Sequence, residues 1–166
     1  METKFIADNN VGKLARWLRM MGYDALSFGE KDDGELIEIA LNEGRVILTK
    51  DTQIAKRRLV VSGRLKTVLI QEDDPESQLR QVVTALDLDC HLRPFSMCLE
   101  CNQPLIPRSK AEVKNLVPPY VFRTQNEYME CPTCHRIYWR GTHWQAMVRQ
   151  LAKLMRADNE SCHQWT

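Results

Sequence analysis

The sequence lacks any stretch that approaches the roughly 18 apolar residues of a membrane span. Its first residues also lack the basic segment followed by an apolar one that marks a secretory signal, so no export is expected. Low-complexity runs and internal repeats are absent as well. With its cysteines taken to be reduced, the chain is therefore expected to be a cytoplasmic protein without a membrane partner.

Histidine is absent from residues 1–90, so chemistry in that part of the chain would have to use other side chains. The composition, 43% apolar and 27% charged over 166 residues, predicts a globular chain with one medium domain and an appendage. The net charge of +1 conceals an asymmetry, because residues 1–91 are net acidic and residues 92–166 are net basic. The basic half weakly indicates an anionic partner.

Four of the six cysteines form two C-x-x-C pairs, Cys98 with Cys101 and Cys131 with Cys134. Each pair can direct two thiolates to one point, so the two pairs supply the four sulfurs of a tetrahedral Zn²⁺ site. The 29 residues between the pairs exceed the usual ~15–20, which predicts an extended hairpin or loop around residues 118–119. We therefore predict a zinc ribbon.

Other interpretations of the cysteines are weaker. The second pair, followed by His135, matches the haem attachment motif C-x-x-C-H, but that chemistry requires export and leaves the first pair unexplained. A thioredoxin-like site needs its pair at the start of a helix, whereas proline-rich and strand-like sequence surrounds both pairs. A disulfide framework does not suit a chain without an expected signal peptide. Cys90 and Cys162 lie outside the pairs and are not expected to bind metal.

The zinc module divides the chain into two predicted domains, residues 1–92 and residues 93–166, the second ending in a helix. In the first domain short apolar strands alternate with amphipathic helices, which predicts a mostly parallel sheet flanked by helices. The predicted strands are residues 4–7, 25–28, 45–49 and 67–70, and helices are expected around residues 11–21, 36–41, 54–59 and 75–86.

Carboxylates recur at the sheet edge where parallel strands end and where ligands of such sheets bind. They are Asp8, Asp32, Asp33, Glu35, Asp51, Asp73 and Asp74. Three or four carboxylates at one edge would repel one another unless cations lay between them. Oxygen ligands select Mg²⁺ or Mn²⁺, and two such ions about 3.5–4 Å apart are a recurrent device for cleaving phosphodiesters.

Helix capping offers a simpler explanation of the same acids. Aspartate is a favoured cap, so Asp8, Asp51 and Asp74 could each simply begin the helix that follows. Asp32 with Glu35 fits a capping box. On spacing alone, capping and solvated charge explain these residues better than a metal site does.

Longer segments resemble a known family, the PIN-like Mut-seven C-terminal ribonuclease domain family. In the first domain they are Asp8-Asn-Asn-Val-Gly-Lys-Leu-Ala-Arg-Trp-Leu-Arg-Met-Met-Gly22, Asp33 seven residues before Ala40, and Gly44-Arg-Val-Ile-Leu-Thr-Lys-Asp51. In the ribbon they are Cys98-Leu-Glu-Cys101-Asn102, Cys131-Pro-Thr-Cys134 and Tyr138-Trp-Arg-Gly-Thr-His-Trp144. The similarity covers about residues 4–150 in the family's order.

The resemblance implies a compact PIN-type α/β domain, a C-terminal zinc ribbon and metal-dependent ribonuclease activity. By motif position it implies that Asp8, Asp33 and Asp51 hold the catalytic Mg²⁺ or Mn²⁺. Asp73 lies where a fourth acid is expected, and its neighbour Asp74 is the alternative. The chain departs from the family at residues 9–10, where two asparagines replace a bulky apolar residue, but the acids are unaffected. With the resemblance, a metal site becomes the favoured interpretation.

Basic residues near these acids are candidates for phosphate contacts. Lys13, Arg16 and Arg19 share one side of the first predicted helix, which in general would be a solvated face. Because this helix begins beside the first acid, Lys13 and Arg16 could also contact RNA phosphates, and so could Lys50. The run at residues 56–58 is a weaker candidate.

The C-terminal region carries an apolar stripe and several aromatic residues. The stripe predicts a helix that docks on the first domain, with a protein partner at this helix or the ribbon as the alternative. The aromatic residues could stack on unpaired bases, but packing around the zinc core is favoured. The stripe is Met147, Leu151, Leu154 and Met155, and the aromatic residues are Tyr138, Trp139 and Trp144.

We predict from these features a metal-dependent ribonuclease that cleaves RNA, with single-stranded segments preferred. The alternative is a non-catalytic RNA- or protein-binding module that keeps the same fold. A phosphoacceptor receiver domain also places acids at strand ends, but about 92 residues with four plausible strands are too few for it.

Overall fold

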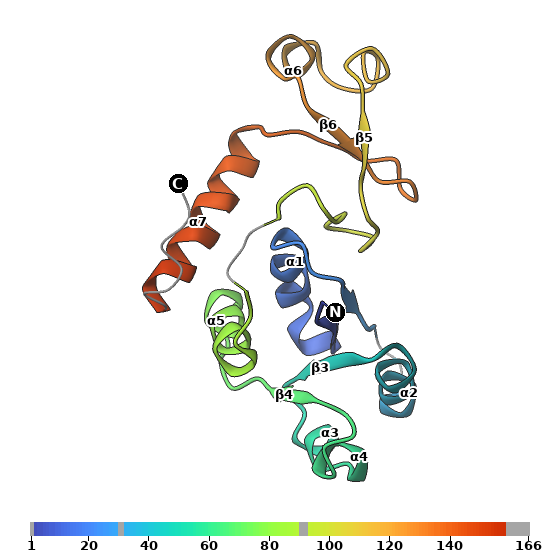
Figure 1. Ribbon diagram of the computed structural model, residues 1–166, viewed down its shortest axis with the longest axis vertical. Coiled ribbons are helices and arrows are strands. Elements are labelled where there is room, and N and C mark those ends of the chain that lie inside the picture. The colour runs from blue at the N-terminus through green and yellow to red at the C-terminus, as the bar shows by residue number, and fades with distance from the viewer. Residues whose placement is uncertain (1, 30–31, 90–92, 159–166) are drawn as a thin grey trace.

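A four-stranded parallel sheet forms the centre of the N-terminal half of the protein (Figure 1). The computed structural model describes residues 2–29, 32–89 and 93–158, with side chains to residue 154. The strands lie in the order β2-β1-β3-β4, which confirms the predicted parallel α/β class. They are β1 (Lys4–Ala7), β2 (Ala25–Ser27), β3 (Arg45–Thr49) and β4 (Thr67–Leu69).

Helices cover both faces of this sheet, so the central strand β3 is buried along its whole length. Alternate residues of a strand point to opposite faces. Phe5 therefore packs in the core with α1 (Gly12–Met20) and α5 (Pro75–Leu86). Its neighbour Ile6 packs in a second core with α2 (Asp33–Glu43).

Two glycines end helices at the predicted places. Gly44 takes the left-handed conformation at the end of α2, with φ 66°. Gly22 follows α1 with φ 97°, and a Cβ there would lie 2.7 Å from Cβ of Arg93. The loop between the two halves thus passes so close to the end of α1 that only glycine fits.

The helix expected around residues 54–59 is divided into two short helices, α3 (Thr52–Ala55) and α4 (Arg58–Val61). Arg57 is extended, with ψ 144°, and begins α4. Ile54 is the one fully buried residue of this segment, so no continuous apolar face holds the two turns in a single helix.

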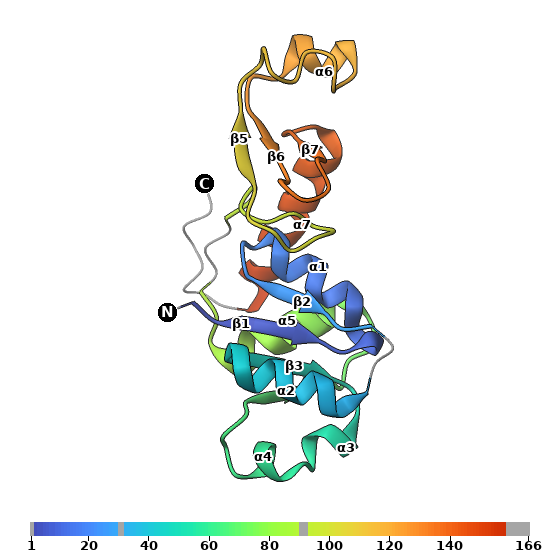
Figure 2. The same cartoon turned by 90° about the vertical axis from the view of Figure 1, so that its right-hand side faces the viewer.

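The C-terminal half contains a small antiparallel sheet in the order β5-β6-β7, whose strands are Ile106–Arg108, Tyr128–Glu130 and Ile137–Tyr138. Between β5 and β6 the chain makes an excursion with helix α6 (Pro119–Thr124), far from the parallel sheet (Figure 2). Val113, Val117 and Tyr128 form a separate core there. The extended loop predicted between the cysteine pairs is this excursion.

The last helix, α7 (Thr142–Asp158), runs from the ribbon back to the N-terminal half and contacts α5 (Figure 1). Leu151 and Leu154 are buried in the same core cluster as Leu79 of α5, as the apolar stripe predicted. Met155 lies beyond the described side chains, and Cys90 and Cys162 lie outside the described residues. No helix in the described parts of the chain is long and apolar enough to cross a bilayer.

Side chains from the two halves meet at the edge strand β2. The amide side chain of Asn102 accepts a hydrogen bond from the Ala25 amide (2.9 Å) and donates one to the Asp24 carboxylate (2.6 Å). Arg45 donates to the same carboxylate at 2.7 Å and to the carbonyl of Phe5 at 3.0 Å. Asp24 thus joins the loop of the first cysteine pair to the sheet.

Arg19 makes a second connection at this edge. Its guanidinium donates to the carbonyls of Ala25 (2.8 Å) and Leu99 (2.7 Å). Arg19 as a whole is only 7% exposed. Burial lowers the pKa of Arg19, although an arginine side chain stays protonated in proteins. The interpretation of this helix side as a solvated face is therefore wrong for Arg19, whereas Lys13 and Arg16 are exposed.

The carboxylate at this junction should make stability depend on pH. Burial alone would raise the pKa of Asp24, but hydrogen bonds from Arg45 and Asn102 outweigh it and lower the pKa. Such a carboxylate stabilises the fold above its unfolded pKa of about 3.9 and loses that contribution as pH falls through the folded value. Asp24→Asn should cost about 1 kcal/mol at pH 7, because Arg45 would lose one of its two charged partners and keep Glu43.

Urea unfolding of both proteins at a series of pH values tests this expectation. The difference in unfolding free energy should shrink below pH ~4. A difference that is constant with pH would show that the charge of Asp24 is irrelevant. Glu38→Gln, at an exposed position of α2, is the control and should match the wild type throughout.

Candidate active site and metal centre

The four paired cysteines converge at one point. Their sulfur atoms all lie within 4.8 Å of one another, and among the described residues they are the one group of three or more potential ligands that does so. The sulfurs of Cys98 and Cys134 are 3.8 Å apart. Zn–S bonds of about 2.3 Å in a tetrahedron require sulfur separations of about 3.8 Å. The cluster is thus compatible with the predicted zinc ribbon.

Each cysteine pair lies on a loop with the same local geometry. The amide of Cys101 donates to Sγ of Cys98 at 3.4 Å, and the amide of Cys134 donates to Sγ of Cys131 at 3.5 Å. The residue after each pair takes the left-handed conformation, with φ 57° at Asn102 and 60° at His135. Asparagine tolerates this conformation better than most residues, so it suits the position.

Electrostatics at the sulfurs favour a bound cation. Burial would raise the pKa of Cys98, but hydrogen bonds from the Tyr138 hydroxyl and from loop amides outweigh it and lower the pKa to about 7. A hydrogen bond with Cys134, then burial, and then repulsion by the neighbouring sulfurs raise the pKa of Cys101 to about 12. Only a cation among them allows all four sulfurs to ionise together.

The aromatic residues of the ribbon mostly pack inward. Tyr138 is 9% exposed and Trp144 is 8% exposed, and their rings lie edge to face at 6.2 Å. The Tyr138 hydroxyl also accepts from the amide of Leu99 at 3.1 Å. Packing around the cysteine cluster, rather than stacking on bases, is the interpretation that this burial supports.

Two of the predicted acids are joined through one hydroxyl at the ends of neighbouring strands. Thr49, the last residue of β3, is fully buried and donates from Oγ1 to Oδ2 of Asp8 (2.8 Å). The same oxygen accepts from the amide of Asp51 (3.0 Å). β1 and β3 are paired in parallel, so their ends meet at one edge of the sheet. Asp8 and Asp51 lie at this edge, as predicted.

Both acids also begin helices, as the capping explanation expects. Asp8 accepts from the amide of Asn9, and Asp51 accepts from the amide of Gln53, each at 2.8 Å. Capping uses one carboxylate oxygen and leaves further lone pairs free. Because capping and metal binding are compatible at the same residue, capping does not decide between the two explanations.

The remaining acids lie at the same ends of the elements but do not join a cluster. Asp33 is the first residue of α2, and Asp32 before it is the cap. Asp73 is 94% exposed and pairs with Lys50 at 2.5 Å, while Asp74 caps α5. No three carboxylates of the described residues come together as the cysteines do.

Of the predicted phosphate contacts, Lys13 is exposed and forms no side-chain hydrogen bond or ion pair within the described residues, while Lys50 pairs with Asp73. Arg16 instead pairs with Glu100 in the first cysteine loop, at 2.7 Å.

Sequence reasoning did not find Thr49 as a connecting residue. A hydroxyl side chain at the end of a buried strand, two residues before an acid, was the available signal.

A sequence model of the family described as the Mut7-C RNAse domain matches residues 3–151. The match covers the parallel sheet, both cysteine pairs and most of α7, and it confirms the resemblance found from the motifs. Comparisons with curated proteins and with solved structures give no significant match.

Zinc should be an integral part of the fold. The protein should purify with about one zinc ion per chain, because metal binding contributes folding free energy to such small modules. Cys131→Ser should lose the ion and unfold the ribbon, and amide exchange at Ala25 should accelerate, because that amide is bonded to Asn102. Metal analysis and amide hydrogen exchange measure both effects.

Cys90→Ser is the matched control, since it alters a cysteine outside both pairs and should keep the zinc. The amide of Ile47 in β3, bonded to the carbonyl of Lys66 just before β4, should stay protected in both variants. Freshly purified, reduced protein without zinc would contradict the assignment of the site.

Proposed function

The chain belongs to the Mut7-C RNAse domain family, and we propose that it is a ribonuclease that uses Mg²⁺ or Mn²⁺ at the strand ends. The observation that carries this proposal is the Thr49 hydroxyl, which connects Asp8 to the backbone of Asp51. RNA is the proposed substrate, with single-stranded segments preferred. Reduced thiolates at a zinc site suit a cytoplasmic enzyme.

The carboxylates fit a magnesium-type ion, although they do not form a closed cage. Mg²⁺ keeps several of its waters and is usually held by one or two carboxylates together with substrate phosphates. Asp8 and Asp51 would hold such an ion, with Asp33 contacting it directly or through water. Asp73 is the proposed fourth acid, and Asp74, which caps α5, is the alternative.

A divalent ion at this edge supplies a Lewis acid that lowers the pKa of bound water and stabilises charge on the phosphate. The Thr49 hydroxyl orients the Asp8 carboxylate, because it must donate its one proton when it accepts from the Asp51 amide. Lys13, on the first turn of α1, would bind a phosphate of the substrate. Residues 1–90 contain no histidine, so a carboxylate at this edge would be the proton acceptor.

The cleavage prediction is that Asp8→Asn and Asp51→Asn each reduce metal-dependent RNA cleavage at least about 100-fold. Asparagine keeps the capping oxygen, so the thermal midpoint should stay the same or rise as repulsion between carboxylates falls. Cleavage of a labelled single-stranded RNA, with added Mg²⁺ or Mn²⁺, is the assay, and thermal unfolding checks the fold.

Asp32→Asn is a matched control, because it makes the same change at the residue before Asp33, and asparagine preserves the cap of α2. It should cleave RNA like the wild type. Full activity in an Asp8→Asn, Asp51→Asn double variant would place the chemistry elsewhere. A wild type that binds RNA but never cleaves it would favour a binding module.

Binding at the same edge should depend on Lys13. Lys13→Ala should weaken RNA affinity and reduce the slope of log K against log salt by about 0.7, the value for one phosphate contact on a single strand. The control is Lys4→Ala, at the opposite end of β1, which should leave the slope unchanged. Fluorescence anisotropy without added Mg²⁺ or Mn²⁺ measures binding without cleavage. Equal slopes for both variants would show that Lys13 makes no phosphate contact.

A further inference from the structure

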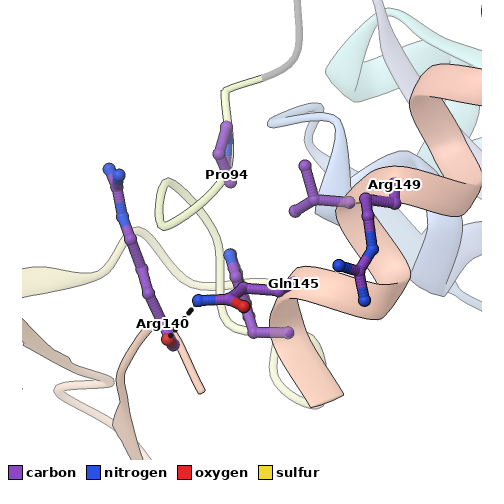
Figure 3. A pocket seen from close by; sticks show the side chains of 6 residues that line it. Pro94, Arg140, Gln145 and Arg149 are labelled. Atoms are coloured by element: carbon purple, nitrogen blue, oxygen red, sulfur yellow. Dashed lines mark hydrogen bonds between the residues drawn. The ribbon is translucent and has the colours of Figure 1, made fainter. Parts of the chain in front are cut away.

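A pocket of about 420 Å³ lies between the start of α7, the ribbon and the segment that joins the two halves. None of the predicted acids or cysteines lines it. Figure 3 shows Arg140 and Arg149 on opposite sides of this pocket, with Pro94 and Gln145 between them. Its lining residues are Pro94, Arg140, Trp144, Gln145, Val148 and Arg149.

The apolar part of the pocket is held rigidly. The ring of Trp144 stacks on Phe95 with centroids 4.3 Å apart and an angle of 7° between the planes. Trp144 itself is buried in the main core cluster, so it contributes an apolar edge rather than a freely exposed ring. Pro94 and Val148 complete an apolar surface with few rotatable bonds, against which a flat ligand could lie without ordering the protein further.

Positive charge surrounds this apolar surface. The Arg140 guanidinium lies over the Phe95 ring at 5.3 Å, and its Nε is 3.6 Å from an exposed carboxylate of Glu127. Arg149 is exposed and forms no ion pair in the described structure. No lining residue is acidic, and residues 131–157 contain neither aspartate nor glutamate. The pocket therefore favours a ligand with both a negative charge and a flat apolar part.

Gln145 adds a polar group with hydrogen-bonding capacity to spare. Its Nε2 donates to the carbonyl of Arg140 at 3.3 Å, as the dashed line in Figure 3 shows. The oxygen of the same amide forms no hydrogen bond within the described residues and can accept one from a ligand. An amide at the rim of an apolar pocket is suited to the polar edge of a nucleobase.

We propose that this pocket binds one nucleotide unit, with its phosphate between Arg140 and Arg149 and its base against Pro94, Trp144 and Val148. The choice of an RNA chain as the source rests on the proposed function, and a free mononucleotide would present the same chemistry. The volume suits one nucleotide. The pocket would hold a part of the substrate that is remote from the strand ends.

The test compares Arg149→Glu with Lys153→Glu in protein that also carries Asp8→Asn to prevent cleavage. Both positions are exposed on α7, one turn apart, but only Arg149 lines the pocket. Affinity for a short labelled oligouridylate should fall about tenfold in Arg149→Glu and less than about twofold in Lys153→Glu. Zinc content and thermal midpoint should match the parent protein in both variants.

The Trp144 indole signal in ¹⁵N NMR spectra reports on the pocket directly. It should shift when oligouridylate is added and stay unchanged in Arg149→Glu. A shift with uridine monophosphate as well would show that a free nucleotide is sufficient, whereas a shift with the oligomer alone would identify RNA as the ligand. No shift with either ligand, or equal weakening by both substitutions, would overturn the proposal.

The two proposals fail in different ways. A protein that cleaves RNA while Arg149→Glu binds as tightly as its parent would refute the pocket and leave the nuclease site intact. A protein that binds through Arg149 but never cleaves RNA with Mg²⁺ or Mn²⁺ would refute the nuclease and leave the pocket.

Discussion

The docking of the first cysteine loop on edge strand β2 is the contact on which the arrangement of the two halves depends. Both backbone polar groups of Ala25 are paired by side chains, its amide by Asn102 and its carbonyl by Arg19. Buried backbone groups are costly without partners, so the sheet edge requires this loop in place. The loop in turn carries two of the four cysteines that could hold a metal ion. The proposed domains, residues 1–92 and 93–166, accordingly share one hydrophobic core.

This dependence connects the zinc site to the candidate active site. The next element along the chain after β2 is α2, whose first residue is Asp33. At the other strand ends, Thr49 fixes the separation of Asp8 and Asp51 through two short hydrogen bonds. The first cysteine loop holds this sheet edge on one side, and the buried Thr49 hydroxyl holds it in the centre. The edge is therefore preorganised before any divalent ion or substrate arrives.

Local patterns predicted the fold well, because short apolar strands, glycines that end helices and paired cysteines can each be recognised within a few consecutive residues. Each parallel strand lies within one residue of its predicted bounds. The burial of Arg19 could not be predicted, because its partner Leu99 lies 80 residues away. The acids stayed ambiguous for a different reason. Aspartate after a strand is both a good helix cap and a good metal ligand, so the residue type and position are the same under both explanations.

The central claim is that a divalent ion binds at the ends of β1 and β3, separately from zinc. Anomalous diffraction from zinc-loaded crystals soaked in Mn²⁺ locates both ions in one experiment. The account predicts a zinc peak among the four sulfurs and a distinct manganese peak in contact with the carboxylates of Asp8 and Asp51. A zinc peak alone, or manganese bound only away from these two residues, would contradict it.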